Sequence, residues 1–303
     1  MATGLQHDAI LADEKIVSAN ASGVSGLLER FNDAVFKLSA LALVVAAVVL
    51  TVGVVASHVL GRALDWQDEV TIFLIAGAVF MSAASVQAKR GHVGIEVLGD
   101  YMTPSGNRAR GLVTDAIALA FVAIFAVKAG TLLYEAWAEG QKTHSAWGPP
   151  LWIPYSLLTA GMTLLALQMA AQVGERSLVT LGLVVAAVAA MLLWSRPPTP
   201  LITGVPQQVI SIAFCVITRI AMFSGMPIAF ALGSVALAFM MLFMRRAAVD
   251  TIAQNVYEEL ANVIILAIPL FILKGAAIGR SNAGRDLYSA QMRSACRRRR
   301  TTA

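Results

Sequence analysis

Long apolar runs, each near the length of a membrane crossing, constrain this chain more than any other feature. A helix needs about 20 apolar residues to cross the hydrocarbon core of a bilayer. The chain is 58% hydrophobic and only 14% charged, whereas a soluble domain is about half apolar and a quarter charged. The sequence therefore predicts an all-α integral membrane protein, with its first crossings at residues 38–59, 70–88, 112–134, 151–173 and 177–194.

The pattern changes after the fifth apolar run. Prolines within 197–200 cannot continue a helix and predict a surface connection. The apolar stretch 205–244 is too long for one simple crossing, and Gly-Met-Pro at 225–227 predicts two short helices or one kinked helix. A last apolar stretch covers 262–278. The pattern therefore predicts five crossings followed by two to three further helices.

The basic residues of the short loops predict the orientation of the chain. The loop between the second and third runs holds four of them, and each neighbouring loop holds one. Loops rich in Lys and Arg stay cytoplasmic, so this loop and the N-terminus are predicted to be cytoplasmic. The residues concerned are Lys89, Arg90, Arg108 and Arg110, against Arg62 and Lys142 in the neighbouring loops.

No constellation in the sequence predicts catalysis or a bound cofactor. Haem ligation is one possibility for histidines in membrane helices. His58 and His92 are, however, predicted to lie on opposite sides of the membrane, so they cannot ligate one haem. No phosphate-binding loop, Ser-His-Asp set or metal-ligand spacing occurs. We therefore predict no catalytic residue, no metal site, and no cofactor bound by this chain.

Two features add charge to an otherwise apolar chain. Five arginines among the last eleven residues account for the net charge of +5; because this basicity is confined to the tail, we expect no nucleic-acid partner. Lys128 and Lys274 lie within apolar runs, where charge is costly. The stem of Lys128 is long enough to reach the interface, whereas Lys274 needs a partner or a path to water.

The stretch 65–96 has charge at both ends of an apolar middle. Asp65, Asp68 and Glu69 precede the apolar residues, and Lys89 and Arg90 follow them. The helix dipole and the positive-inside rule explain these signs, and Asp68 is a candidate N-cap. They do not explain the continuation Arg-Gly-His-Val-Gly-Ile-Glu at 90–96.

This order of residues resembles the small Q subunit of tripartite ATP-independent periplasmic (TRAP) transporters. The resemblance covers about residues 30–175, with Glu96 where the family often has Asp. A second resemblance, to the N-terminal part of the large M subunit, covers residues near 225–233 and 266–275. The residues that carry the first are Arg62, Trp66, Asp68, Glu69, Arg90, Gly91, His92 and Glu96, and those that carry the second are Gly225, Pro227, Gly233, Pro269 and Gly275.

The resemblance implies a four-helix Q-type bundle, one linker transmembrane helix and two to three helices of an incomplete M-type scaffold. It divides the chain into five parts. These are a cytoplasmic segment (1–36), a Q-like domain (37–175), a linker helix with a periplasmic connection (176–206), an M-like N-terminal fragment (207–288) and a basic tail (289–303). The tail does not resemble the M continuation, so we expect a truncation or a shifted reading frame near residue 289. The M hairpins that carry the family's substrate site are not recognised, so substrate-binding residues are not predicted.

The resemblance also implies a function. The family imports organic acids, such as C4-dicarboxylates or sialic acids, across the bacterial inner membrane with Na+ as the coupling ion. The implied partners are a periplasmic binding protein, the large M subunit or its remainder, and the lipid bilayer. We expect the motif residues to set helix positions and subunit contacts rather than to touch substrate. The alternatives are a non-transporting or inactive truncated scaffold and, less favoured, a haem-bearing membrane anchor.

Overall fold

The computed structural model describes residues 24–61, 65–95, 103–143, 145, 147–193, 202 and 204–280, and its regular elements there are helices. Four helices are long and apolar enough to cross a membrane. They are α2 (Val24–Leu60), α3 (Asp65–Ala88), α4 (Pro104–Ala138) and α5 (Trp152–Arg176). Shorter helices follow: α6 (Leu178–Leu193), α7 (Gln207–Phe223), α8 (Ile228–Phe243), α9 (Arg246–Asp250), α10 (Ile252–Leu260) and α11 (Val263–Arg280). The all-α prediction is confirmed.

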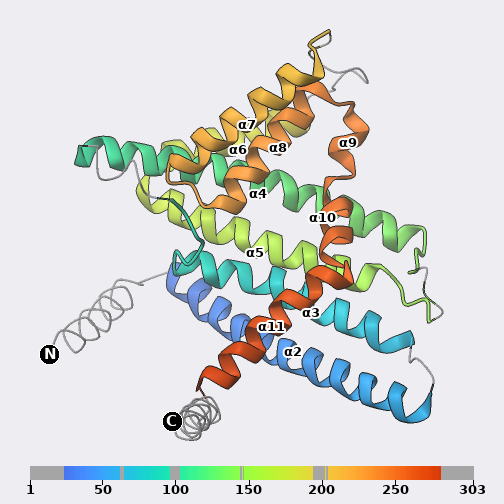
Figure 1. Ribbon diagram of the computed structural model, residues 1–303. Helices are drawn as coiled ribbons and strands as arrows, with labels where there is room; N and C mark the ends of the chain where they lie inside the picture. The colour runs from blue at the N-terminus through green and yellow to red at the C-terminus, as the bar shows by residue number, and fades with distance from the viewer. Residues whose placement is uncertain are drawn as a thin grey trace, which may run out of the picture.

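The four long helices pack side by side in the order α2, α3, α5, α4 (Figure 1). Helix α6 packs on α4 and α5, α7 and α8 form a pair, and α8 and α10 contact α4. Small residues allow the closest approach: a Cβ on Gly161 of α5 would lie 2.5 Å from the backbone carbon of Phe80 in α3. Glycine lets membrane helices approach to backbone contact, so this position fixes how α3 and α5 pack.

Three of the long helices begin earlier than the predicted crossings, and α4 begins at Pro104 rather than at residue 112. Helix α2 begins at Val24, well before residue 38, because its first turns pack on the bundle: Asn32 is buried and its side-chain amide donates to Gln168 Oε1 of α5 at 2.9 Å. Helix α3 begins at Asp65, so Asp68 lies inside the first turn instead of capping it. Of the two alternatives for 205–244, two helices are observed, separated at residues 224–227.

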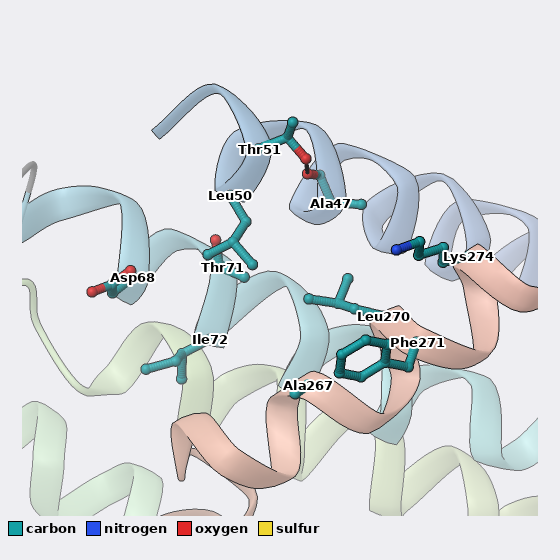
Figure 2. Close-up of a pocket in the computed structure, with 10 residues that line it drawn as sticks. All are labelled: Ala47, Leu50, Thr51, Asp68, Thr71, Ile72, Ala267, Leu270, Phe271 and Lys274. Carbon is teal, nitrogen blue, oxygen red and sulfur yellow. Dashed lines mark hydrogen bonds between the residues drawn. The ribbon is translucent and has the colours of Figure 1, made fainter. Parts of the chain in front are cut away.

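Helix α11 crosses the bundle at an angle and rests on α2 and α3 (Figure 1). A pocket of about 450 Å³ lies between these helices, and its lining is mostly apolar (Figure 2). Asp68 and Lys274 lie at opposite ends of this pocket in Figure 2, and Lys274 forms no ion pair with the residues that the structure describes.

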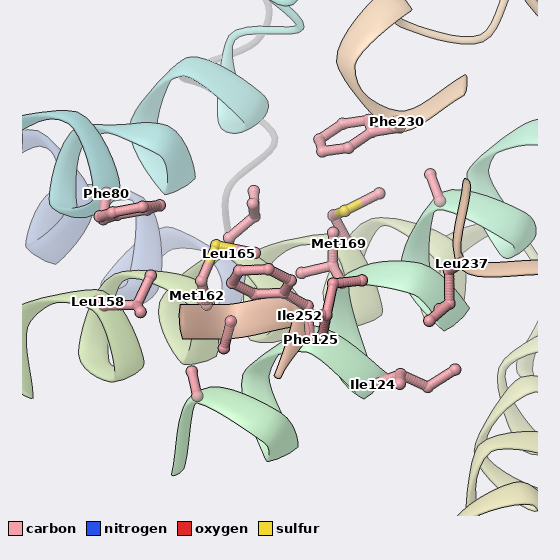
Figure 3. Close-up of a cluster of buried hydrophobic side chains, with 14 of the residues drawn as sticks. Phe80, Ile124, Phe125, Leu158, Met162, Leu165, Met169, Phe230, Leu237 and Ile252 are labelled. Atoms are coloured by element: carbon pink, nitrogen blue, oxygen red, sulfur yellow. The ribbon is translucent and has the colours of Figure 1, made fainter. Parts of the chain in front are cut away.

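The largest hydrophobic core joins the long helices to the later, shorter ones. Side chains of α3, α4 and α5 meet side chains of α8 and α10 in one buried cluster (Figure 3). Burial of such side chains is the main source of stability outside the lipid-facing surface, through close van der Waals packing. Members of the cluster include Phe80, Phe125, Leu158, Met169, Phe230, Leu237 and Ile252.

A second link between early and late helices is ionic. The Lys128 ammonium of α4 pairs with the Asp250 carboxylate at the end of α9. The Lys128 side chain is 18% exposed and that of Asp250 45%. Lys128 therefore has an ionic partner within the chain, so its charge does not depend on the membrane interface alone for stabilisation.

Replacing Lys128 with methionine should lower the thermal unfolding temperature of the detergent-solubilised protein, because Asp250 loses a charged partner. We expect a cost of about 1 kcal/mol, the upper range for a pair that water still reaches. The matched control is Lys37→Met: Lys37 also pairs with an aspartate, Asp33, but its side chain is 77% exposed. Equal effects of the two substitutions would contradict a stabilising role for the Lys128 pair.

Candidate functional site

The segment that follows α3 pairs directly with the turn between α7 and α8. The Ile228 N–H donates to the Val93 carbonyl oxygen at 2.9 Å. Gly94 and Pro227 form an isolated antiparallel bridge. A Cβ on Gly94 would lie 3.5 Å from the Gly225 carbonyl oxygen. Two motifs that are far apart in the sequence therefore form one contact, which we call the Q–M junction (residues 90–95 with 224–230).

His92 contributes a ring to this junction. Its imidazole meets the ring of Phe230 edge to face, with centroids 5.0 Å apart. The Nε2 atom is buried and has no hydrogen-bond partner among the described residues. Burial lowers the pKa of His92 below its usual value, and the Ala83 backbone offsets this in part. The ring is thus held neutral against an apolar surface.

Arg110, in the second turn of α4, links α4 to the turn between α7 and α8. Its Nη1 donates to the Ser224 carbonyl oxygen at 2.7 Å, and Nε and Nη2 donate to Asn107 Oδ1 at 3.0 and 2.6 Å. Gly225, which follows Ser224, has φ +82°, and a Cβ there would lie 2.1 Å from Arg110 Nη1. Glycine is needed at 225 both for its left-handed backbone and for the space that the guanidinium occupies.

Arg90 and Gly91 end helix α3. The Gly91 N–H donates to the Val86 carbonyl at 2.8 Å and the Arg90 N–H to that of Gln87 at 3.0 Å. This is the Schellman pattern, with Arg90 at the left-handed position (φ +48°). The Arg90 guanidinium then lies 3.4 Å from Asp115 Oδ2, an oxygen that Arg176 also approaches at 2.7 Å.

The other end of α3 also approaches the later helices. Glu69 is half-buried there. Burial raises the pKa of the Tyr257 phenol of α10, and the charges of Tyr155 and Glu69 raise it further. The Tyr257 ring in turn meets Tyr155 of α5 edge to face, with centroids 5.0 Å apart. Trp66 is 45% exposed and Asp68 is exposed, so neither belongs to this contact.

The other predicted motif residues divide into two groups. Gly233 faces α4: a Cβ there would lie 2.4 Å from the ring of Phe121. Pro269 lies inside α11, and Gly275 has open space around it. Arg62 and Glu96 lie outside the described residues. The structure thus brings Arg90, Gly91, His92, Gly225 and Pro227 together and leaves Trp66, Asp68, Pro269 and Gly275 elsewhere.

Sequence reasoning missed several residues of the junction. Arg110 entered only as a loop charge that sets orientation, and Asp115 and Arg176 were not singled out. A signal for Asp115 does exist, because it is an acid at the start of the third apolar run. Nothing local in the sequence pairs Arg110 with the Ser224 carbonyl, since 114 residues separate them.

The junction should weaken in acid because of His92. Its pKa is lowered in the folded protein, so the folded state binds fewer protons than the unfolded state as pH falls below about 6.5. The stability that it supports is present above that pH and is lost as pH falls through the lowered pKa. We expect the unfolding temperature of the wild type to drop more between pH 7.5 and 5 than that of His92→Phe, which cannot be protonated. Equal drops would contradict a buried neutral imidazole.

No group of three His, Cys, Asp or Glu residues suited to a metal ion occurs among the described residues. The family model for the DctQ component of tripartite ATP-independent periplasmic transporters matches residues 46–178. The model for the DctM component of the same transporters matches residues 212–303. A search of curated proteins gives no match. The five domain boundaries inferred above stay predictions, but the family resemblance is confirmed.

The first match covers the C-terminal part of α2, from residue 46, and all of α3, α4 and α5, and the second begins within α7. Components of these transporters are membrane transport proteins and not enzymes. The chain therefore belongs to the tripartite ATP-independent periplasmic transporter family and carries DctQ and DctM sequence in one polypeptide.

Proposed function

We propose that this chain forms the membrane scaffold in sodium-coupled uptake of organic acids, of the C4-dicarboxylate or sialic acid kind. A periplasmic binding protein delivers the substrate, and Na+ is the coupling ion. In this proposal the DctQ helices brace the DctM helices and hold them at a fixed depth and angle in the membrane. The motif residues of α3 serve this bracing and do not touch substrate.

The observation that carries the proposal is that α3 and the segment after it contact the DctM helices in more than one place. At one end the Val93 carbonyl accepts from Ile228, and His92 packs on Phe230. Closer to its other end, α3 contacts α11, and Leu270 of α11 packs against the buried cluster that contains Ile75 of α3. Between them, Phe80 of α3 and Phe230 of α8 belong to the same buried cluster. A helix anchored in this way fixes the position of the helices that it contacts.

We also propose that the junction lies on the cytoplasmic side of the inner membrane, with the N-terminus in the cytoplasm. Lys89, Arg90, Arg108 and Arg110 favour this side. Alternate crossings by α3 to α7 bring the end of α7 to the same face as the end of α3, and the bond from Arg110 to Ser224 agrees with that.

The test is uptake by proteoliposomes that hold the DctM component, with and without this chain. The assay supplies a periplasmic binding protein loaded with radiolabelled succinate or sialic acid, and an inward Na+ gradient. We expect accumulation that requires the chain, the binding protein and the gradient together. Uptake that is equal without this chain would overturn the bracing role, and uptake that ignores the gradient would overturn sodium coupling.

Variants separate bracing from substrate recognition. We expect Glu69→Gln and His92→Phe to reduce co-purification with the DctM component before they change which acid is taken up. Trp66→Phe is the control, because Trp66 is on the same helix but lies outside the contact. Variants that assemble normally but exchange one substrate for another would show that these residues recognise substrate instead.

A further inference from the structure

A cavity of about 970 Å³ lies beside the Q–M junction, where α3 and α5 end and α4 begins. The turn between α7 and α8 contributes Gly225 and Pro227 to its wall. Guanidinium groups from three helix ends line it: Arg90, Arg108, Arg110 and Arg176. Among the lining residues that the structure describes, Asp115 is the acidic one.

The charges that line this cavity do not balance. Arg90 and Arg176 share the single Asp115 carboxylate, at 3.4 and 2.7 Å. The Arg110 guanidinium is held by two neutral oxygens, those of Asn107 and Ser224. Arg108 is exposed and forms no ion pair with any residue that the structure describes. Several like charges around one cavity repel one another, so an anion that enters it relieves that repulsion.

We propose that this cavity binds a phosphate group, carried by an anionic phospholipid or by free phosphate. Guanidinium forks match phosphate oxygens with two parallel hydrogen bonds, which makes arginine the preferred side chain for such groups. Helix α4 adds its N-terminus, which begins at Pro104 after the Thr103 cap and favours negative charge. The Ser105 hydroxyl, also on the wall, adds a further donor.

The depth of the cavity favours a lipid as the source of the phosphate. It lies at the ends of the long apolar helices, which is the level of lipid headgroups when these helices cross the bilayer. Basic pockets between membrane helices on the cytoplasmic side are suited to anionic headgroups. This step rests on the membrane orientation given under the proposed function, whereas the affinity of the cavity for phosphate does not.

The test uses the full chain in detergent and compares the wild type with Arg108→Gln. This substitution removes a guanidinium that forms no ion pair within the described part of the chain, so folding is not expected to change. Thermal unfolding and native mass spectrometry are recorded with phosphatidylglycerol, phosphatidylcholine and inorganic phosphate. Lys37→Gln is the control. It also removes an exposed positive charge, but Lys37 does not line the cavity.

We expect phosphatidylglycerol to raise the unfolding temperature of the wild type and phosphatidylcholine to do so much less. Arg108→Gln should weaken phosphatidylglycerol binding about tenfold, as expected for one charge-assisted contact, while Arg108→Lys should recover part of it and Lys37→Gln should leave it unchanged. Competition by millimolar inorganic phosphate would assign the cavity to free phosphate. Equal binding of the two lipids with no response to phosphate, or no effect of Arg108→Gln, would overturn the proposal. If the wild type binds phosphatidylglycerol but supports no uptake in the proteoliposome assay, the proposed function is wrong and the phosphate site stands.

Discussion

Replacing Gly161 with alanine is expected to destabilise the protein strongly, because it forces apart two helices that pack through their backbones. The new Cβ would lie 2.5 Å from the carbonyl carbon and oxygen of Phe80 and 2.9 Å from the Met81 nitrogen. These are backbone atoms, so no rotamer change relieves the contact, and α3 and α5 must move apart. Overpacking of this kind costs about 3 kcal/mol. The measurement is the thermal unfolding temperature in detergent.

Gly182→Ala is the matched control for Gly161. It lies in α6, and nothing stands within 4 Å of the position where its Cβ would be. Alanine there is expected to be neutral or to stabilise by up to about 1 kcal/mol through its better helix propensity. If both variants unfold at the same temperature, α3 and α5 do not pack through Gly161.

Replacing Gly225 with alanine should break the link between Arg110 and the turn after α7. A non-glycine residue at φ +82° costs about 1–2 kcal/mol. The Cβ also occupies the position of Arg110 Nη1, so the bond to the Ser224 carbonyl is lost, at a further cost of about 1.5–3 kcal/mol for a charged donor. We expect the unfolding temperature in detergent to fall, and to fall much more than for a control glycine that also has positive φ.

Gly140→Ala separates the two causes. Gly140 has φ +63°, close to that of Gly225, but nothing lies within 4 Å of its Cβ position. It therefore reports the backbone cost alone, and the excess at Gly225 reports the displacement of Arg110. An effect at Gly225 no larger than that at Gly140 would mean that Arg110 does not hold this turn.

Much of the architecture was predictable from the sequence, because the length of an apolar run fixes how it meets a bilayer. The break at Gly225 was predictable for the same kind of reason: glycine before Met-Pro ends one helix and allows the next to begin. The early start of α2 was not, since residues 24–37 are mixed in polarity and become helical by packing. Asn32 shows this, because it is buried by a bond to Gln168 that lies 136 residues away.

The short helices α9 and α10 also escaped prediction. Their sequence alternates charged and apolar residues and gives no apolar run, yet Ile252, Ala253 and Tyr257 are buried against the bundle. The junction was predictable in its parts but not as a contact. The family resemblance identified His92 and Pro227 separately. Their proximity depends on tertiary packing, which brings the end of α3 next to the turn between α7 and α8. Arg110 was counted only as a charge for the same reason.

Disulfide formation between Gly94→Cys and Pro227→Cys tests the Q–M junction most directly. These residues are bridge partners, and Cα atoms of antiparallel partners lie about 4.5–5.5 Å apart, within the range of a disulfide. The background replaces Cys215 and Cys296 with serine, and a protease site is inserted within Pro197–Pro200. After oxidation and cleavage, the two fragments should migrate as one species on a non-reducing gel and separate on reduction. Separation without reductant, at the level seen for Gly94→Cys paired with Ser211→Cys at the start of α7, would contradict the junction.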